Sequence, residues 1–238
     1  MRRHPRGVAI LFLLAAALVT RFAGAGGANG SGSTRSSGPC AQCVTSLPEG
    51  ADPRPLLVLL HGDGETAQMM MGEWGRAAEA RGVAVLALQC PRSEGCSAQS
   101  WWQWDRPVDG WLTAQVDAVR RQRAIDEHRM WVVGWSGGAS YIGRRTQEFE
   151  RTFAAIVIHG GGVPPASDVC PATRSGVFFL VGDANPLHAL SERLHDHYTS
   201  CSNPTVWTLV HRADHQAERA SLASHREAIL DWLATQQR

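Results

Sequence analysis

Short apolar runs alternate with longer stretches of mixed polar and apolar residues along most of this chain. The runs are nearly continuous in apolar residues, which predicts strands buried on both faces, as in a parallel sheet covered by helices. Strands are predicted over residues 56–60, 83–88, 130–133, 154–158, 177–181 and 205–210, with a further edge strand over 43–47. Helices are predicted over residues 65–81, 109–127, 139–149, 186–199 and 217–236. This alternation is typical of an α/β fold with a doubly wound, mostly parallel sheet.

The first 25 residues have the pattern of a secretion signal. A basic start precedes an apolar run from Val8 to Val19, and Ala23-Gly24-Ala25 gives a small-x-small cleavage site. The apolar run is shorter than the ~20 residues of a membrane-spanning helix, so no membrane span is expected after cleavage. We therefore expect a secreted or periplasmic protein. Residues 26–39 are predicted to be a flexible Gly/Ser-rich linker, and residues 40–238 one folded domain.

Net charge and cysteine usage narrow the classes of partner and cofactor. A formal net charge of +1 gives no electrostatic reason to expect binding to nucleic acid. Six cysteines in an exported domain favour disulfides over metal or redox sites. We expect the pairs Cys90–Cys96 and Cys170–Cys201, which leaves Cys40 and Cys43 as a tight pair beside the linker. No second C-x-x-C or paired histidine motif accompanies Cys40 and Cys43, so no metal is expected.

The sequence Gly134-Trp135-Ser136-Gly137-Gly138 reads G-x-S-x-G between a predicted strand and a predicted helix. This context is that of a nucleophile elbow, a tight turn that exposes the serine hydroxyl. Gly134 and Gly138 would remove Cβ atoms where the two elements crowd the serine backbone. The helix start favours negative charge that develops near Ser136.

Other reactive side chains follow the ends of later predicted strands. Asp183 and Asn185 follow the strand over 177–181, and His211 and His215 follow the strand over 205–210. Ligands of open parallel sheets bind beyond the carboxyl ends of the strands, so these residues are expected near Ser136. A serine needs a neighbouring imidazole to accept its proton, and the two histidines are the candidates.

With these motifs the chain resembles the α/β-hydrolase superfamily from about Pro53 to Leu233, without a cap domain. It is similar to small lidless carboxylesterases and to secreted enzymes of the feruloyl-esterase and poly(3-hydroxybutyrate)-depolymerase type. The resemblance implies that Ser136 is the nucleophile and that His215 is the base, with His211 as the alternative. It further implies an oxyanion hole formed by the backbone amides of Gly137 and of Asp63 or Gly64.

The third member of the triad departs from the superfamily pattern. Spacing places Asn185 where the superfamily commonly has an aspartate, and Asp183 lies two residues earlier. A carboxylate orients the histidine and stabilises its imidazolium, whereas an amide can only orient it. Chemistry therefore favours Asp183 and spacing favours Asn185, and of the two we expect Asp183 to orient the histidine.

Aromatic residues and histidines near the strand ends are the candidates for the substrate pocket. They are His61, Trp101, Trp102, Trp104, Trp135 and His159. These features together predict an exported serine hydrolase that cleaves small or polymeric carboxylic esters through an acyl-enzyme, without a cofactor. A serine peptidase or thioesterase is the alternative within enzymes, and a non-catalytic binding protein of the same fold is the alternative outside them.

Overall fold

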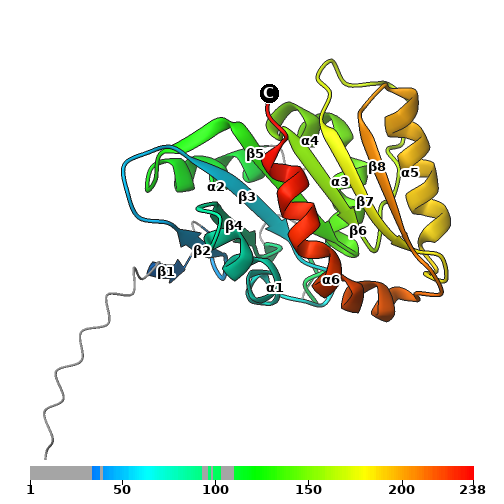
Figure 1. Ribbon diagram of the computed structural model, residues 1–238, viewed down its shortest axis with the longest axis horizontal. Coiled ribbons are helices and arrows are strands. Elements are labelled where there is room, and N and C mark those ends of the chain that lie inside the picture. Colours follow the sequence, from blue (N-terminus) through cyan, green and yellow to red (C-terminus); the bar gives the residue numbers. More distant parts are fainter. Residues whose placement is uncertain (1–33, 38–39, 93–95, 98, 103–109) are drawn as a thin grey trace, which may run out of the picture. The chain divides into compact units, whose positions relative to one another are not determined.

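The computed structural model describes residues 34–37, 40–92, 96–97, 99–102 and 110–238 (Figure 1). These residues form an eight-stranded sheet in the order β1-β2-β4-β3-β5-β6-β7-β8. Strands β3 to β8 are parallel, and β1 and β2 are antiparallel to their neighbours. The strands are β1 (Thr34–Ser37), β2 (Val44–Leu47), β3 (Arg54–Leu60), β4 (Ala84–Leu88), β5 (Ile125–Trp135), β6 (Ala155–His159), β7 (Gly176–Gly182) and β8 (Thr205–Val210).

Helices cover both faces of this sheet (Figure 1). One face carries α1 (Ala67–Glu79) and α6 (His215–Ala234), and the other carries α2 (Trp111–Arg120), α3 (Gly137–Arg144), α4 (Thr146–Thr152) and α5 (His188–Ser200). Alternate residues of a strand supply the two cores. In β3, Leu56 and Val58 pack under α2 to α5, whereas Leu57 and Leu59 pack under α1 and α6. Each such fully buried side chain contributes about 1.5–3 kcal/mol, which is why β3 reads as a continuous apolar run.

The predicted α/β class and mostly parallel sheet are confirmed, with differences at several element ends. The helix predicted over 139–149 is two helices, α3 and α4, which meet at Arg145. The helix predicted over 109–127 ends at Arg120, because β5 begins at Ile125. The last helix begins at His215 and not at residue 217, which matters for the site described below.

The edge of the sheet includes part of the range that was predicted as a linker. Strand β1 lies within residues 26–39 and pairs antiparallel with β2, from Thr34 opposite Leu47 to Ser37 opposite Val44. The predicted edge strand over 43–47 is present as β2, and it pairs with β4. Residues 1–33, which include the predicted signal peptide, lie outside the described residues.

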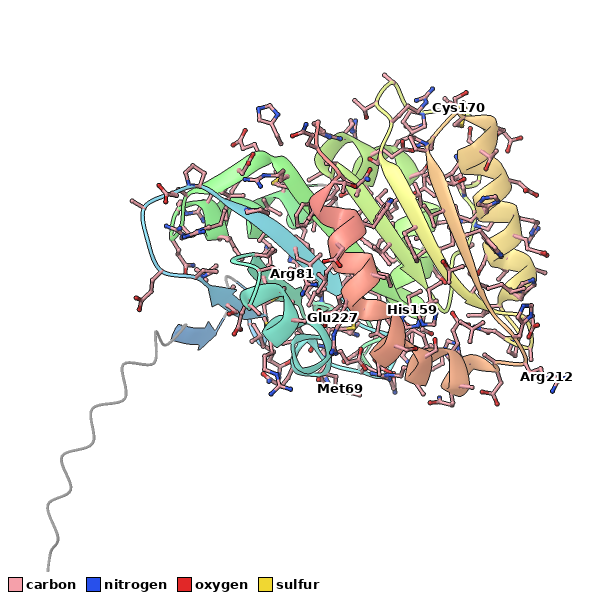
Figure 2. The ribbon with its side chains drawn as sticks, viewed as in Figure 1. Met69, Arg81, His159, Cys170, Arg212 and Glu227 are labelled. Carbon is pink, nitrogen blue, oxygen red and sulfur yellow. A yellow bond between two sulfur atoms is a disulfide. The ribbon has the colours of Figure 1, made fainter. Side chains whose placement is uncertain are left out.

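All six cysteines of the chain lie in described residues and are paired. The expected bridges Cys90–Cys96 and Cys170–Cys201 are both formed, and Cys40 bonds Cys43. Cys170 lies at the opposite end of the sheet from His159 (Figure 2). The bridge to Cys201 therefore lies near the amino-terminal ends of the last strands, away from the strand ends that include His159. Among the described helices, none combines the length and the apolar character needed to cross a membrane.

Candidate active site

Ser136 lies at the junction of β5 and α3 in a backbone conformation that non-glycine residues rarely adopt, with φ 50° and ψ −110°. Its neighbours explain why the motif needs glycine. A Cβ on Gly134 would lie 2.6 Å from the Ala139 backbone, and one on Gly138 would lie 2.5 Å from the carbonyl oxygen of Leu60. The tight approach of β3, β5 and α3 therefore fixes the turn and presents the Ser136 hydroxyl at the carboxyl edge of the sheet.

His215 faces this serine from the first turn of α6. Its Nε2 lies 3.0 Å from Ser136 Oγ. The turn is fixed by Asp214, whose Oδ1 accepts hydrogen bonds from the backbone amides of Gln216 and Ala217 at 3.1 and 2.9 Å.

The indole ring of Trp135 stacks against the imidazole ring of His215. The two rings stack with their centroids 4.6 Å apart and an interplanar angle of 17°. The Arg219 guanidinium lies over the Trp135 ring, 5.3 Å from the ring centroid, and Glu65 accepts the Trp135 indole N–H at 3.2 Å. Burial lowers the pKa of His215 below its ordinary value and outweighs the opposing effect of the Glu65 charge. A neutral imidazole, as a general base requires, is therefore favoured near neutral pH.

Asn185 occupies the third position, and this corrects the preference for Asp183. The Nδ2 atom of Asn185 lies 3.1 Å from His215 Nδ1. Asp183 continues the ladder between β7 and β8 through its amide, and its carboxylate accepts from Arg212 N at 2.5 Å and lies 3.3 Å from His211 Nδ1. Within the described residues no hydrogen bond joins Asp183 to His215, because its carboxylate is directed toward residues 211 and 212.

His211, the alternative candidate for the base, contacts Asp183 in the same turn. Its side chain is 79% exposed, and the partner that it contacts is Asp183. In the described structure it makes no contact with Ser136. Of the two histidines, only His215 is brought to the serine hydroxyl.

The loop after β3 lies beside the serine as expected, and it is fixed by buried contacts. His61 is fully buried, its Nδ1 lies 2.7 Å from Gly62 O, and its Nε2 accepts from Cys90 N at 3.0 Å. Asp63 Oδ1 accepts from Trp102 N at 2.9 Å, and burial raises the pKa of Asp63. The Asp63 carboxylate also packs against Gly137, where a Cβ would lie 2.3 Å from Oδ1. The loop and the start of α3 are thus held together at the place where an oxyanion hole is expected.

Comparisons with known proteins agree with this architecture. No family model matches the sequence. The chain is 32% identical over 154 residues to "Putative esterase NocK" of Nocardia uniformis subsp. tsuyamanensis, a match that covers 60% of this chain and 42% of that protein. The chain therefore spans less than half the length of this curated relative.

Solved esterase structures match most of the chain. A thermostable esterase superposes with a TM-score of 0.60 at 21% identity, over 82% of this chain and 59% of that one. A truncated carbohydrate esterase from gut microbiota superposes with a TM-score of 0.65 at 14% identity, over 87% of this chain and 97% of that one. The chain has the α/β-hydrolase fold.

In this α/β-hydrolase fold the residues predicted for the substrate pocket differ in how far they are exposed. Trp101 is 56% exposed, and its indole nitrogen lies 3.9 Å from where a Gly64 Cβ would be, so it can border the site. Trp104 lies outside the described residues. The remaining candidates are buried beneath the site, each with at most 5% of its surface exposed: His61, Trp102, Trp135 and His159. The prediction that these four side chains line the substrate pocket is therefore corrected, because buried rings have little surface to offer a substrate.

Sequence reasoning missed a second layer of polar residues on α6 and α1. Glu218 is fully buried, and its Oε2 accepts from Asn185 Nδ2 at 2.7 Å and from Gly182 N at 2.8 Å. Arg219 pairs with Glu65 and Glu73. The signal was available in principle, since Glu218 and Arg219 lie one helical turn after His215, on the same face. Because the helix was expected to begin at residue 217, the spacing of His215, Glu218 and Arg219 did not indicate a shared helix face.

No group of three or more His, Cys, Asp and Glu side chains in the described parts of the chain could hold a metal ion.

Proposed function

We propose that the protein is an exported serine esterase that cleaves carboxylic esters through an acyl-enzyme. The observation that carries this proposal is the 3.0 Å separation of Ser136 Oγ and His215 Nε2 at the elbow. The esterase relative and the fold of the esterase structures support the reaction class. The disulfides, together with the expected signal peptide, support export.

The proposed reaction has two halves. Ser136 Oγ attacks the ester carbonyl while His215 Nε2 takes the hydroxyl proton, and the backbone amides of Gly137 and of Asp63 or Gly64 hold the oxyanion. The imidazolium then gives its proton to the departing alcohol, which leaves the acyl group on Ser136. A water molecule, deprotonated by His215, attacks the acyl-enzyme, and Ser136 regains its proton as the carboxylic acid departs. The same machinery acts on amides and thioesters, so the choice of ester is tested by comparison of the three substrates.

The first prediction tests the nucleophile. Ser136→Ala should abolish labelling by a fluorophosphonate probe and lower kcat for p-nitrophenyl esters by about 10⁶. Ser224→Ala, on the exposed face of α6, is the matched control and should react like the wild type. Activity of Ser136→Ala within tenfold of the control would refute the assignment. A series of p-nitrophenyl esters of increasing acyl length would then define the acyl pocket.

A further inference from the structure

A continuous chain of polar contacts leads from the nucleophile into the protein interior. Ser136 Oγ contacts His215 Nε2, His215 Nδ1 contacts Asn185 Nδ2 at 3.1 Å, and Asn185 Nδ2 donates to Glu218 Oε2 at 2.7 Å. Glu218 is completely buried and Asn185 is 5% exposed. The chain therefore ends on a carboxyl group shielded from solvent, where a charge interacts strongly with its neighbours.

The orientation of the Asn185 amide is dictated by two partners other than His215. Its Oδ1 accepts the backbone N–H of Leu187 at 2.9 Å. Its Nδ2 donates to the carboxylate of Glu218. Turning the amide over would set its NH₂ against the Leu187 N–H and its oxygen against a carboxylate oxygen, which is unfavourable at both ends while Glu218 is ionised.

This orientation decides where the proton of a neutral His215 lies. The second N–H of the Asn185 amide faces Nδ1 of His215, so Nδ1 must accept and the ring proton must lie on Nε2. Nε2 is the atom that faces Ser136. In this tautomer the imidazole donates to the serine oxygen and has no lone pair there to accept the serine proton, so the arrangement is unproductive for nucleophilic attack.

We propose that Glu218 is a positioning residue that sets the tautomer of His215 through the amide of Asn185. Ionised Glu218 holds the amide with its NH₂ toward His215. Neutral Glu218 instead donates its O–H to Asn185 Oδ1, and the same oxygen accepts the proton of His215 Nδ1, which frees Nε2 to accept from Ser136. The inference rests on the proposed esterase function and adds a residue that governs its base.

The burial of Glu218 favours its neutral form. Burial raises the pKa of Glu218, against the lowering effects of the hydrogen bonds from Asn185, Gly182 and Gly160 and of the His188 charge. The titratable group whose charge acts on the Glu218 carboxyl is His188 from α5, while His159 from β6 reaches only the backbone of residue 218. Because His159 Nε2 lies 3.3 Å from the backbone carbonyl of Glu218, it contacts the helix backbone and not the carboxyl group.

The rearrangement takes the present hydrogen-bond acceptors from two groups, the Leu187 N–H and the Asn185 NH₂ that donates to Glu218 Oε2. When the Asn185 amide turns, the Leu187 N–H loses its acceptor. The productive state is therefore reached only when the proton on Glu218 compensates for that loss. Activity should need a protonated Glu218 and a neutral His215 together, which gives a bell-shaped dependence of kcat on pH.

The decisive variant is Glu218→Gln, because the glutamine amide is uncharged, nearly isosteric, and donates N–H to Asn185 Oδ1 at every pH. We expect kcat for p-nitrophenyl acetate to rise by roughly tenfold or more on the alkaline side, and the alkaline limb of the pH profile to disappear. The ¹⁵N NMR spectrum of His215 should move from the Nε2–H to the Nδ1–H form. Glu227→Gln, on the exposed face of the same helix, is the control and should change neither readout.

Asn185→Asp is an independent second variant, since a carboxylate at this position accepts from Nδ1–H and still accepts from Leu187 N–H. It should also give the Nδ1–H tautomer and a higher kcat, and more so when combined with Glu218→Gln. A folded Glu218→Gln protein with lower kcat and an unchanged tautomer would overturn the inference. If the tautomer switches but no variant hydrolyses esters or reacts with the fluorophosphonate probe, the positioning role stands and the proposed esterase function falls.

Discussion

In the turn after β8, the proposed catalytic histidine and an exposed histidine differ in the contacts that they make. His215 lies 3.0 Å from the serine oxygen, whereas His211 is exposed and paired with Asp183. We therefore expect His215→Ala to lower kcat by about 10⁶, as the loss of a triad base does, and His211→Ala to change it little. Steady-state kinetics on one p-nitrophenyl ester at saturating substrate measures both. A larger effect at His211 would move the base to that residue.

The residue scale is also where prediction from sequence was least secure. Ser136 could be identified because its glycines and the flanking strand and helix form a local pattern. The third position could not, because Asp183 and Asn185 lie in one turn and their side chains point apart. Backbone bonds that no spacing rule records, such as Asp183 N to Val210 O, decide the direction. The role of Glu218 depends on a helix beginning at His215, which the apolar pattern did not reveal.

Among the elements, the close contact between β3 and α3 is the most sensitive to a single methyl group. Gly138→Ala would place a Cβ 2.5 Å from Leu60 O, which is backbone and cannot move aside easily. We expect a loss of about 1–3 kcal/mol in the free energy of unfolding, with reduced activity because Ser136 shifts. Chemical denaturation and ester hydrolysis of the same preparations measure the two effects.

Gly72 in α1 is the matched control for this change. A Cβ there would meet nothing within 4 Å. Gly72→Ala should stabilise the protein by roughly 0.4–1 kcal/mol, because alanine restricts the unfolded chain and favours a helix. Equal effects of the two substitutions would show that the β3–α3 contact is looser than described.

Most elements were predictable because their apolar runs report burial on both faces of the sheet. Strands β3, β4, β6, β7 and β8 fall close to the predicted ranges for this reason. The break between α3 and α4 at Arg145 was not predictable, since polar and apolar residues continue at helical spacing across it. Helix ends of this kind depend on how the chain must turn to reach the next strand.

Across the whole molecule, buried histidines should make the fold sensitive to acid. Burial lowers the pKa of His159 to about 3, and burial lowers the pKa of His61 in the same direction. Below pH ~6.5 the unfolded chain binds protons that the folded one does not, so stability is lost as the pH falls toward the folded-state value. His159 should therefore lower the free energy of unfolding by about 1.4 kcal/mol per pH unit in that range, and His61 should act in the same direction.

His159→Gln tests this dependence. The variant should be less stable at pH 7.5, where it loses packing against Trp135, but its stability should fall less between pH 6 and pH 4.5. Urea unfolding at each pH gives the slope. His128→Gln, at an exposed position, is the control, and a slope equal to that of the control would refute the role of His159.

Because Asp214 caps the first turn of α6, the position of His215 depends on how often this helix end frays. Terminal turns open far more often than a domain unfolds, and here the turn that opens carries His215. Amide hydrogen exchange of Gln216 and Ala217 should therefore report the fraction of molecules in which His215, the proposed base, is displaced from Ser136, while the sheet remains protected. Asp214→Ala should accelerate that exchange and bring heat inactivation several degrees below global melting, so that the enzyme stops working before it unfolds.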